Sequence, residues 1–196
     1  MKKPKKNINI VVLLGTLREG RMSERVAKFV LTKLKENKEI KTTFIDVRDL
    51  NFSHTDEGPG RISKNRKWKN AIVNADGLII ITPEYNRGYP GSLKYALDMM
   101  LKEYIHKPVA VCGVSSGRFA GVRVIESLLS VLRELGLVVT FTDLNIGSVK
   151  DTVKEDGTVE DERVHKQAEA FITELIWMAK SLRYGRESIP SKYHKK

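Results

Sequence analysis

The sequence predicts an α/β fold, a three-layer sandwich in which helices cover both faces of a five-stranded parallel sheet. Hydrophobic runs of strand length alternate along the chain with longer segments whose apolar residues recur at helical spacing. Loops rich in glycine and hydroxyl side chains directly follow several of these runs, where parallel sheets place their binding loops. Parallel strands also need long crossover connections, which the helical segments can provide.

The first strand is expected at 8–14, where an apolar run broken only by Asn9 ends at Gly15, as in a strand that is buried on both faces. A helix is expected at 23–35, because its apolar residues share one helix face. The same criteria place further strands at 42–47, 78–82, 108–114 and 138–141, and further helices at 62–74, 91–104, 121–135 and 161–183. The polar segment 154–158 is expected to be a turn.

The most economical arrangement of these elements is a flavodoxin-like sheet with strand order 2-1-3-4-5. This order opens a crevice between strands 1 and 3 and brings the loops that follow them side by side. With 196 residues the chain fits one domain. We expect this domain to span 7–183, between a basic N-terminal tail, 1–6, and a basic C-terminal tail, 184–196.

Charge and cysteine content restrict the class of protein. The net charge is +11, but much of the excess lies in the two expected tails, which indicates solvated ends and no specific nucleic-acid surface. No apolar run is long enough to cross a bilayer, so no membrane insertion is expected. A lone Cys112 rules out an intrachain disulfide and fits a reducing, cytoplasmic location.

The loop after the first strand has the residues of an anion site. Thr16 and Ser23 offer hydroxyl groups, Arg18 and Arg21 offer positive charge, and the following helix offers the free N–H groups of its first turn. Its glycine spacing matches neither the nucleoside triphosphate loop nor the Rossmann dinucleotide motif. In the alternative interpretation, Ser23 only caps the helix and the arginines are solvated.

Two further loops complete a composite site. The segment 82–94 holds two prolines and two glycines within nine residues, and its Tyr85 and Asn86 suit a planar heterocycle. The loop 113–121 is also small, hydroxylated and glycine-rich. An anion pocket beside an aromatic-bearing loop is the pattern that a flavin mononucleotide (FMN) requires, with its phosphate at one end and its ring system at the other.

The chain resembles the NADPH-dependent FMN reductase family over roughly residues 7–180. The resemblance lies in Gly15-Thr16-Leu17-Arg18 with Gly20-Arg21, Thr82-Pro83-Glu84-Tyr85-Asn86, Gly88-Tyr89-Pro90-Gly91 with Leu93-Lys94, Ala96-Leu97-Asp98, and the loop from Gly117 to Gly121. This flavodoxin-like family includes quinone, chromate, azo-dye and flavin reductases. The resemblance implies noncovalent FMN, NADPH or NADH as electron donor, a small-molecule electron acceptor, and a homodimer or homotetramer.

The resemblance also assigns the site by position. The phosphate would be surrounded by Thr16, Arg18, Arg21 and Ser23, the isoalloxazine lined by Pro83, Glu84, Tyr85 and Asn86, and its other edge faced by Ser115, Ser116 and Gly117. The chain departs from the family pattern at Thr16, where serine is common, and at Ala120, which replaces the first glycine of a common pair. FMN carries the hydride chemistry, so no catalytic side chain is expected. The spacing of the histidines predicts no metal site.

Two alternatives remain open. In the first, the chain is a flavin-binding electron carrier or adaptor with little turnover of its own. Cys112 and Arg118 also fit the Cys-x5-Arg spacing of phosphatases that use a thiolate nucleophile. Against the phosphatase, Cys112 lies within an apolar strand, where a buried and inert thiol is the ordinary state.

Overall fold

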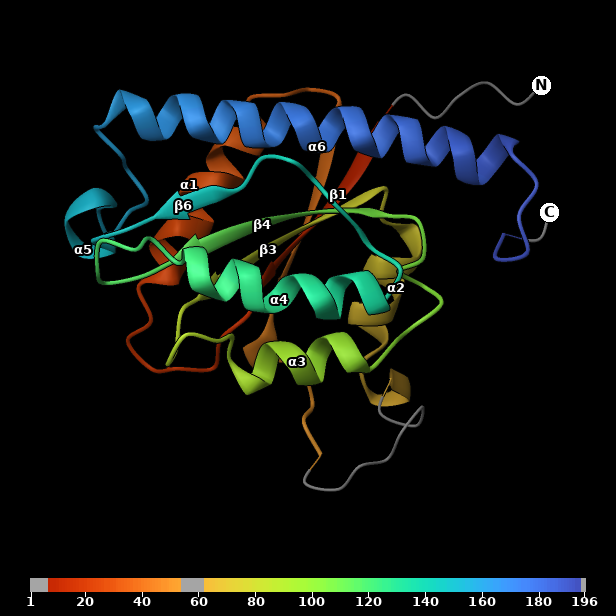
Figure 1. Cartoon of the computed structure of the whole chain (residues 1–196), viewed down its shortest axis with the longest axis horizontal. Helices are drawn as coiled ribbons and strands as arrows, with labels where there is room; N and C mark the ends of the chain where they lie inside the picture. Colours follow the sequence, from red (N-terminus) through yellow and green to blue (C-terminus); the bar gives the residue numbers. More distant parts are fainter. Residues whose placement is uncertain (1–6, 54–61, 195–196) are drawn as a thin grey trace.

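The structure is a computed structural model that describes residues 7–53 and 62–194, and it has the predicted three layers (Figure 1). The strands of the central sheet are β1 (Ile8–Leu14), β2 (Ile40–Asp46), β3 (Gly77–Pro83), β4 (Pro108–Val114), β5 (Val138–Val139) and β6 (Leu144–Ile146). All pairings are parallel and the order is β2-β1-β3-β4-β5, which confirms the predicted topology. The sixth strand pairs with the carboxyl half of β4.

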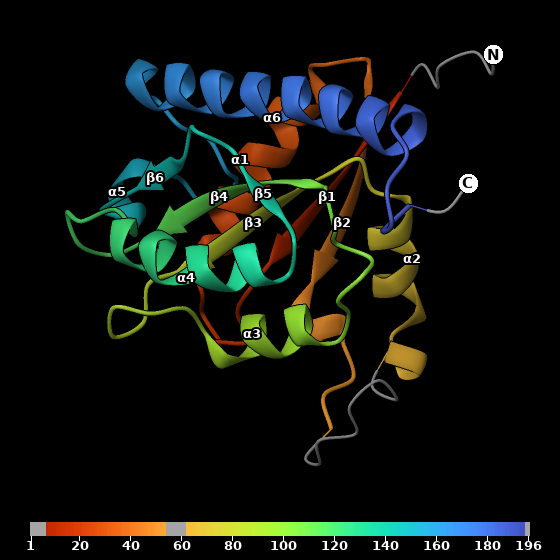
Figure 2. The ribbon, with the colours of Figure 1, turned by 45° about the vertical axis from the view of Figure 1, so that its right-hand side comes forward.

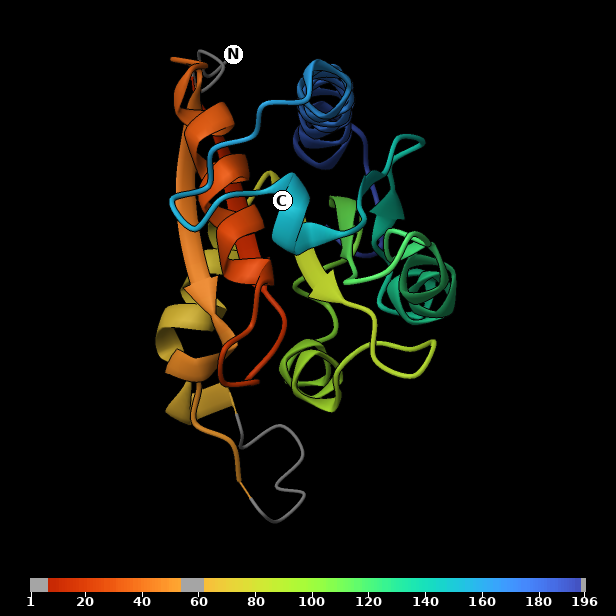
Figure 3. The ribbon, with the colours of Figure 1, turned by 90° about the vertical axis from the view of Figure 1, so that its left-hand side faces the viewer.

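Helices cover both faces of the sheet. They are α1 (Ser23–Lys35), α2 (Arg66–Asn74), α3 (Gly91–Asp98), α4 (Val122–Glu134), α5 (Val149–Thr152) and α6 (Glu162–Ser188), with a 3-10 turn, η1, at Val47–Asp49. Figures 2 and 3 show α6 on one side of the sheet and α3 and α4 on the other. None of the helices within the described ranges is long and apolar enough to cross a membrane.

Two hydrophobic cores explain why β1 is apolar from Ile10 to Leu14. Side chains alternate between the faces of a strand. Ile10 and Val12 therefore pack with α1 and α6, whereas Val11 and Leu13 pack with α2, α3 and α4. Each face contributes a separate buried cluster, so both faces of this strand need apolar residues.

Several element bounds differ from the prediction. The second strand starts at Ile40 and ends at Asp46, earlier than the predicted 42–47. It ends there because Asp46 caps η1, its side chain accepting a hydrogen bond from the Arg48 backbone N–H. The helix expected at 62–74 starts at Arg66, and the one expected at 91–104 ends at Asp98. The missed β6 has only three residues, too few for a recognisable apolar pattern.

The last helix continues five residues beyond the predicted end at Arg183, so the tail expected to begin at 184 starts within α6. Charged contacts hold this extension: Arg183 lies 3.2 Å from the Asp76 carboxylate, and Arg186 donates to the His106 carbonyl at 2.7 Å. The Asp76 side chain is only 10% exposed, which strengthens its pairing with these arginines. The expected N-terminal tail, 1–6, lies outside the described residues.

The segment 189–194 is expected to come loose from the domain in acid. His106 Nδ1 lies 3.0 Å from His194 Nε2, a hydrogen bond that needs at least one neutral ring. Burial, followed by the charges of His106, Arg186 and Lys107, lowers the pKa of His194. The contact is therefore fully formed above the ordinary histidine pKa of about 6.5 and is lost as the pH falls through the lowered value.

Hydrogen–deuterium exchange of residues 189–194, corrected for intrinsic rates, should be faster at about pH 5 than at about pH 8. His106→Ala should remove this difference by loosening the segment at both pH values. Equal protection of the wild-type segment at both would contradict the prediction.

Candidate functional site

The carboxyl ends of β1, β3 and β4 meet at one edge of the sheet, as the predicted strand order requires. Backbone hydrogen bonds tie the loops that follow them together. The Gly15 N–H donates to the Ile81 carbonyl, and the Glu84 N–H donates to the Val114 carbonyl, both at 2.9 Å. The three loops singled out in the sequence therefore form one surface.

Two adjoining cavities open on this surface. The first, about 380 Å³, is lined by Arg18, Glu19, Gly20, Arg21, Met22, Ser23, Pro83, Glu84, Tyr85, Val114, Ser115, Ser116 and Val149. The second, about 610 Å³ and more open, is lined by Thr16, Leu17, Arg18, Glu84, Tyr85, Asn86, Pro90, Gly91 and Ser92. The first cavity brings together most of the predicted site residues. Of the others, Thr16 and Asn86 line only the second cavity, and Gly117 lines neither.

Ser23 has an unpartnered hydroxyl at the start of α1. It is 2% exposed, and its Oγ has no hydrogen-bond partner among the described residues. The N-cap position is Met22, which makes no side-chain cap, so Ser23 does not cap the helix as the alternative interpretation supposed. A buried hydroxyl without a partner costs free energy. This one lines a cavity at a helix N-terminus, where backbone N–H groups favour an anion.

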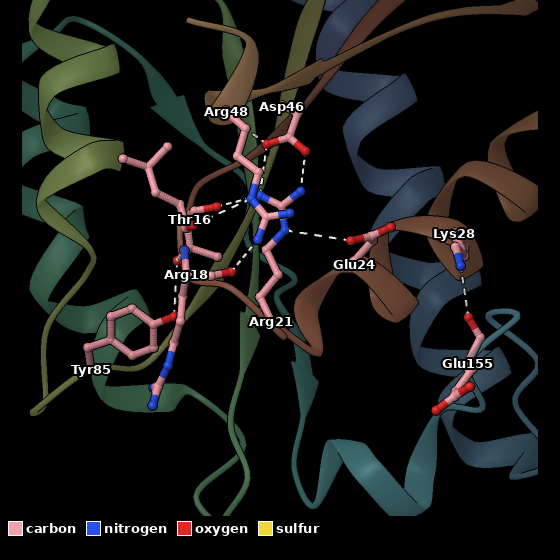
Figure 4. Close-up of polar contacts among 10 residues, drawn as sticks. Thr16, Arg18, Arg21, Glu24, Lys28, Asp46, Arg48, Tyr85 and Glu155 are labelled. Atoms are coloured by element: carbon pink, nitrogen blue, oxygen red, sulfur yellow. Dashed lines mark hydrogen bonds and ion pairs between the residues drawn. The ribbon is translucent and has the colours of Figure 1, made fainter. Parts of the chain in front are cut away.

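Tyr85 connects the loops after β1 and β3. Its hydroxyl lies 3.0 Å from Thr16 Oγ1, which also accepts a hydrogen bond from the Arg18 N–H. The Arg18 guanidinium lies over the Tyr85 ring, 5.3 Å from its centre, and Figure 4 shows it extending away from Asp46. The Tyr85 ring and the Arg18 side chain thus line both cavities.

A tight turn sets the direction of Tyr85. The N–H and carbonyl groups of Tyr85 and Gly88 exchange two hydrogen bonds of 2.9 Å. Between them Asn86 and Arg87 have φ of 51° and 66°, the left-handed pair typical of a type I′ turn. Asparagine tolerates this conformation better than most residues, which explains its place here.

Arg21 lies at the back of the loop after β1. Both of its terminal nitrogens contact the Asp46 carboxylate, one at 2.8 Å, and one also contacts the Thr16 carbonyl (Figure 4). Burial tends to raise the pKa of Asp46, but hydrogen bonds from Arg21 and the Arg48 N–H outweigh it and hold that pKa below its usual value. The guanidinium thus has protein partners on the side of β2, and its predicted contact with a phosphate stays a prediction.

Sequence reasoning missed Asp46 and Arg48. The register pairs Asp46 with Leu14, so the carboxylate stands beside the start of the binding loop. An acidic residue at the carboxyl end of a strand next to β1 was the signal that could have indicated it.

Glu84 also has an unpartnered oxygen. Its Oε1 pairs with Arg123 at 3.2 Å, while its buried Oε2 has no partner within the described part of the chain. Arg123, at the start of α4, also lies over the Phe119 ring, 3.8 Å from its centre. Sequence reasoning missed Arg123, because only the fold brings it to Glu84. The free Oε2 can accept a hydrogen bond from a ligand N–H or hydroxyl.

The loop after β4 folds back through a contact between two glycine backbones. A Cβ on Gly113 would lie 2.6 Å from the Gly121 carbonyl oxygen, so only glycine fits there. Ala120 and Gly121 both have positive φ, 51° and 74°. Alanine thus occupies a left-handed position, which costs roughly 1–2 kcal/mol relative to glycine.

Cys112 does not support the phosphatase alternative. It is fully buried in β4, and burial, followed by the charge of Asp143, raises the pKa of its thiol. A thiol of this kind forms no thiolate at neutral pH. Arg118, its supposed partner, lies on an exposed part of the loop after β4. Among the described residues, no group of three or more His, Cys, Asp or Glu side chains could hold a metal ion.

Cys112→Ala is therefore expected to leave the Kd for FMN and the rate of NADPH oxidation within about twofold of wild type. The change removes one buried sulfur, which should cost on the order of 1 kcal/mol of stability. Flavin fluorescence titration measures the Kd, the absorbance of NADPH measures the rate, and a thermal melt measures the stability. Abolished turnover in a folded variant would restore a catalytic role for the thiol.

Comparison with known proteins identifies the family. The family model described as NADPH-dependent FMN reductase matches residues 8–151, which contain all three loops. The chain belongs to this family.

Individual known proteins resemble this FMN reductase family member over different lengths. The NADPH azoreductase of Bacillus sp. (strain OY1-2) is 30% identical over 122 residues, 62% of this chain and 66% of that protein, just under two thirds of its length. The 2-hydroxy-1,4-benzoquinone reductase of Burkholderia sp is 28% identical over 171 residues, 84% of this chain and 92% of that protein. Among solved structures, FerB, a flavoenzyme NAD(P)H:(acceptor) oxidoreductase from Paracoccus denitrificans, superposes with a TM-score of 0.71 at 26% identity and covers 88% of this chain and 98% of FerB.

The site of this FMN reductase family member fits the cofactor. The unpartnered Ser23 hydroxyl, the α1 N-terminus and Arg18 suit a phosphate. The Tyr85 ring offers a flat face, and the free Glu84 oxygen can accept from a flavin donor group.

Proposed function

We propose that the chain is an FMN-dependent NAD(P)H oxidoreductase that passes electrons from NADPH or NADH to a small acceptor such as a quinone, a flavin, an azo compound or a metal oxyanion. One observation carries this proposal. The first cavity joins the α1 N-terminus, where the Ser23 hydroxyl has no hydrogen-bond partner in the described part of the chain, to a wall formed by Pro83 and Tyr85.

In the proposed enzyme the side chains bind and orient. FMN supplies the hydride-accepting and electron-donating chemistry when it is bound. Arg18 and Ser23 hold the phosphate, and Pro83, Tyr85 and Ser116 border the ring. Glu84, oriented by Arg123, accepts a hydrogen bond from the cofactor. No side chain is assigned as a general acid or base.

The second cavity is the proposed place for the acceptor. It shares Arg18, Glu84 and Tyr85 with the first cavity and is open enough to admit planar molecules of several shapes. The names of the relatives, an azoreductase and a benzoquinone reductase, support planar acceptors. Neither cavity supports a choice between NADH and NADPH.

We further propose a cytoplasmic homodimer or homotetramer. Several large apolar side chains are exposed, Leu101 after α3 at 58%, Phe119 before α4 at 63% and Phe141 after β5 at 96%, and subunit contacts would cover them. Light scattering after size-exclusion chromatography measures the assembly directly, and a monomer at micromolar concentration would contradict this part of the proposal.

The function is tested with purified protein, FMN and NADPH. The preparation should be yellow and release FMN on heating. Anaerobic NADPH should bleach the flavin absorbance, and a quinone should restore it within the turnover time. Bleaching too slow for turnover would favour the electron carrier or adaptor. A colourless protein that does not bind added FMN would overturn the proposal.

A further inference from the structure

We propose that Asp46 is a positioning residue for phosphate binding: through Arg21 it holds the loop after β1 in its binding conformation, although Asp46 itself lines neither cavity. This inference rests on the proposed function, because the phosphate in question is that of FMN. It gives Arg21 a second role beside the predicted phosphate contact, and it adds Asp46 and Arg48 to the residues on which binding depends.

Two arginines hold three consecutive carbonyl groups of the loop. Arg21 donates to the Thr16 carbonyl. Arg48 donates to the Arg18 carbonyl and, at 3.4 Å, to the Leu17 carbonyl. Figure 4 shows these contacts gathered near the end of β2. All three carbonyl oxygens of residues 16–18 therefore have guanidinium partners.

Asp46 holds the Arg21 guanidinium and the Arg48 backbone in place. Its carboxylate accepts from both terminal nitrogens of Arg21, and its Oδ1 also accepts from the Arg48 N–H at 2.9 Å. The Arg21 side chain is only 3% exposed. A buried guanidinium needs a paired carboxylate, and the two-point contact fixes its orientation as well as its charge.

This arrangement, here called the carbonyl clamp (Arg21, Asp46 and Arg48), serves anion binding. A carbonyl oxygen carries partial negative charge, so a carbonyl turned toward a phosphate would repel it. The clamp occupies these oxygens, and the Ser23 hydroxyl, the Arg18 side chain and Arg21, whose Nε has no hydrogen-bond partner among the described residues, line the cavity. The loop can then offer donors alone to the phosphate.

Simple electrostatics makes the opposite prediction for Asp46. Asp46→Asn removes a negative charge near the anion site, so a purely charge-based view expects FMN to bind more tightly. The carbonyl clamp expects FMN to bind less tightly, because the arginines lose the group that orients them. The direction of the change therefore distinguishes the two views.

The experiment compares FMN with riboflavin, which lacks the phosphate, by flavin fluorescence titration. Asp46→Asn should weaken FMN binding by about 10-fold or more and leave riboflavin within about twofold. Asp98→Asn is the matched control: it is the same substitution in an exposed ion pair with Lys94 on α3. Both flavins should bind this variant with wild-type affinity. Thermal melts of each variant accompany the titrations.

Arg48→Lys provides a second test that does not depend on the buried pair. It keeps the positive charge at an exposed position but cannot donate to two carbonyls with the same geometry. FMN affinity should again fall by several-fold with riboflavin unchanged.

The clamp is wrong if wild type binds FMN and Asp46→Asn binds it equally well or better. It is also wrong if both variants lose FMN and riboflavin in parallel, since the role would then be general folding. A wild type that binds neither flavin overturns the proposed function itself.

Discussion

Gly121→Ala is expected to lower the melting temperature by roughly 5–20 °C. A Cβ at this position would lie 2.5 Å from the Gly113 carbonyl carbon, a distance that real Cβ contacts do not reach. The residue also has φ of 74°, which alanine adopts at a cost. Overpacking and the left-handed backbone together amount to about 2–5 kcal/mol, and each kcal/mol shifts the melting temperature of a domain this size by about 2–4 °C.

Thermal unfolding followed by circular dichroism measures the effect. Gly185→Ala is the matched control, because Gly185 lies within α6 with its nearest neighbouring side-chain atom at 4.0 Å. Alanine should there raise stability by about 0.5–1 kcal/mol, since it is the better helix former. If Gly121→Ala had the melting temperature of the wild type, the close approach of β4 and α4 would not exist in solution.

Ser23→Asp is expected to abolish FMN binding in a folded protein. The side chain lies at the first position of α1, where a carboxylate suits the helix dipole but occupies the proposed phosphate site. Two charges about 4 Å apart repel by about 4 kcal/mol at an effective dielectric constant of about 20, which corresponds to roughly a 1,000-fold loss of affinity.

Fluorescence titration with FMN and riboflavin checks this expectation. Ser23→Ala, which removes the hydroxyl without adding charge, should lose only about 10-fold in FMN affinity. The loss of riboflavin affinity in Ser23→Asp should be much smaller than the loss of FMN affinity, because riboflavin carries no phosphate. Undiminished FMN binding by Ser23→Asp would place the phosphate elsewhere.

The topology was predictable because it follows from patterns that extend over whole elements. The apolar run of β1 and the helical spacing in α1 indicate burial on two faces and on one face, respectively. The binding loops were predictable for a related reason, since strand order alone determines which loops meet. The three-residue β6 and the end of α6 depend on tertiary contacts, such as those of Asp76, that no local pattern contains.

The parts of the site that sequence reasoning missed are pairs of residues far apart in the chain. Asp46 meets Arg21 only because β1 and β2 pair in one register, with Leu14 opposite Asp46. A shift by one residue would turn the carboxylate to the other face of the sheet. Arg123 meets Glu84 only because the Gly113–Gly121 contact brings α4 against β4. The spacing of these residues along the sequence therefore predicts neither contact.

The place of α6 has a consequence for synthesis on the ribosome. This helix is about 40 Å long and forms, together with α1, the cover over one face of the sheet, yet it is made after every strand that it covers. While residues 162–188 are still inside the exit tunnel, the faces of Ile10, Val12 and Ile79 toward α6 remain open to water. A nascent chain paused at this stage would present a hydrophobic surface for chaperones to bind.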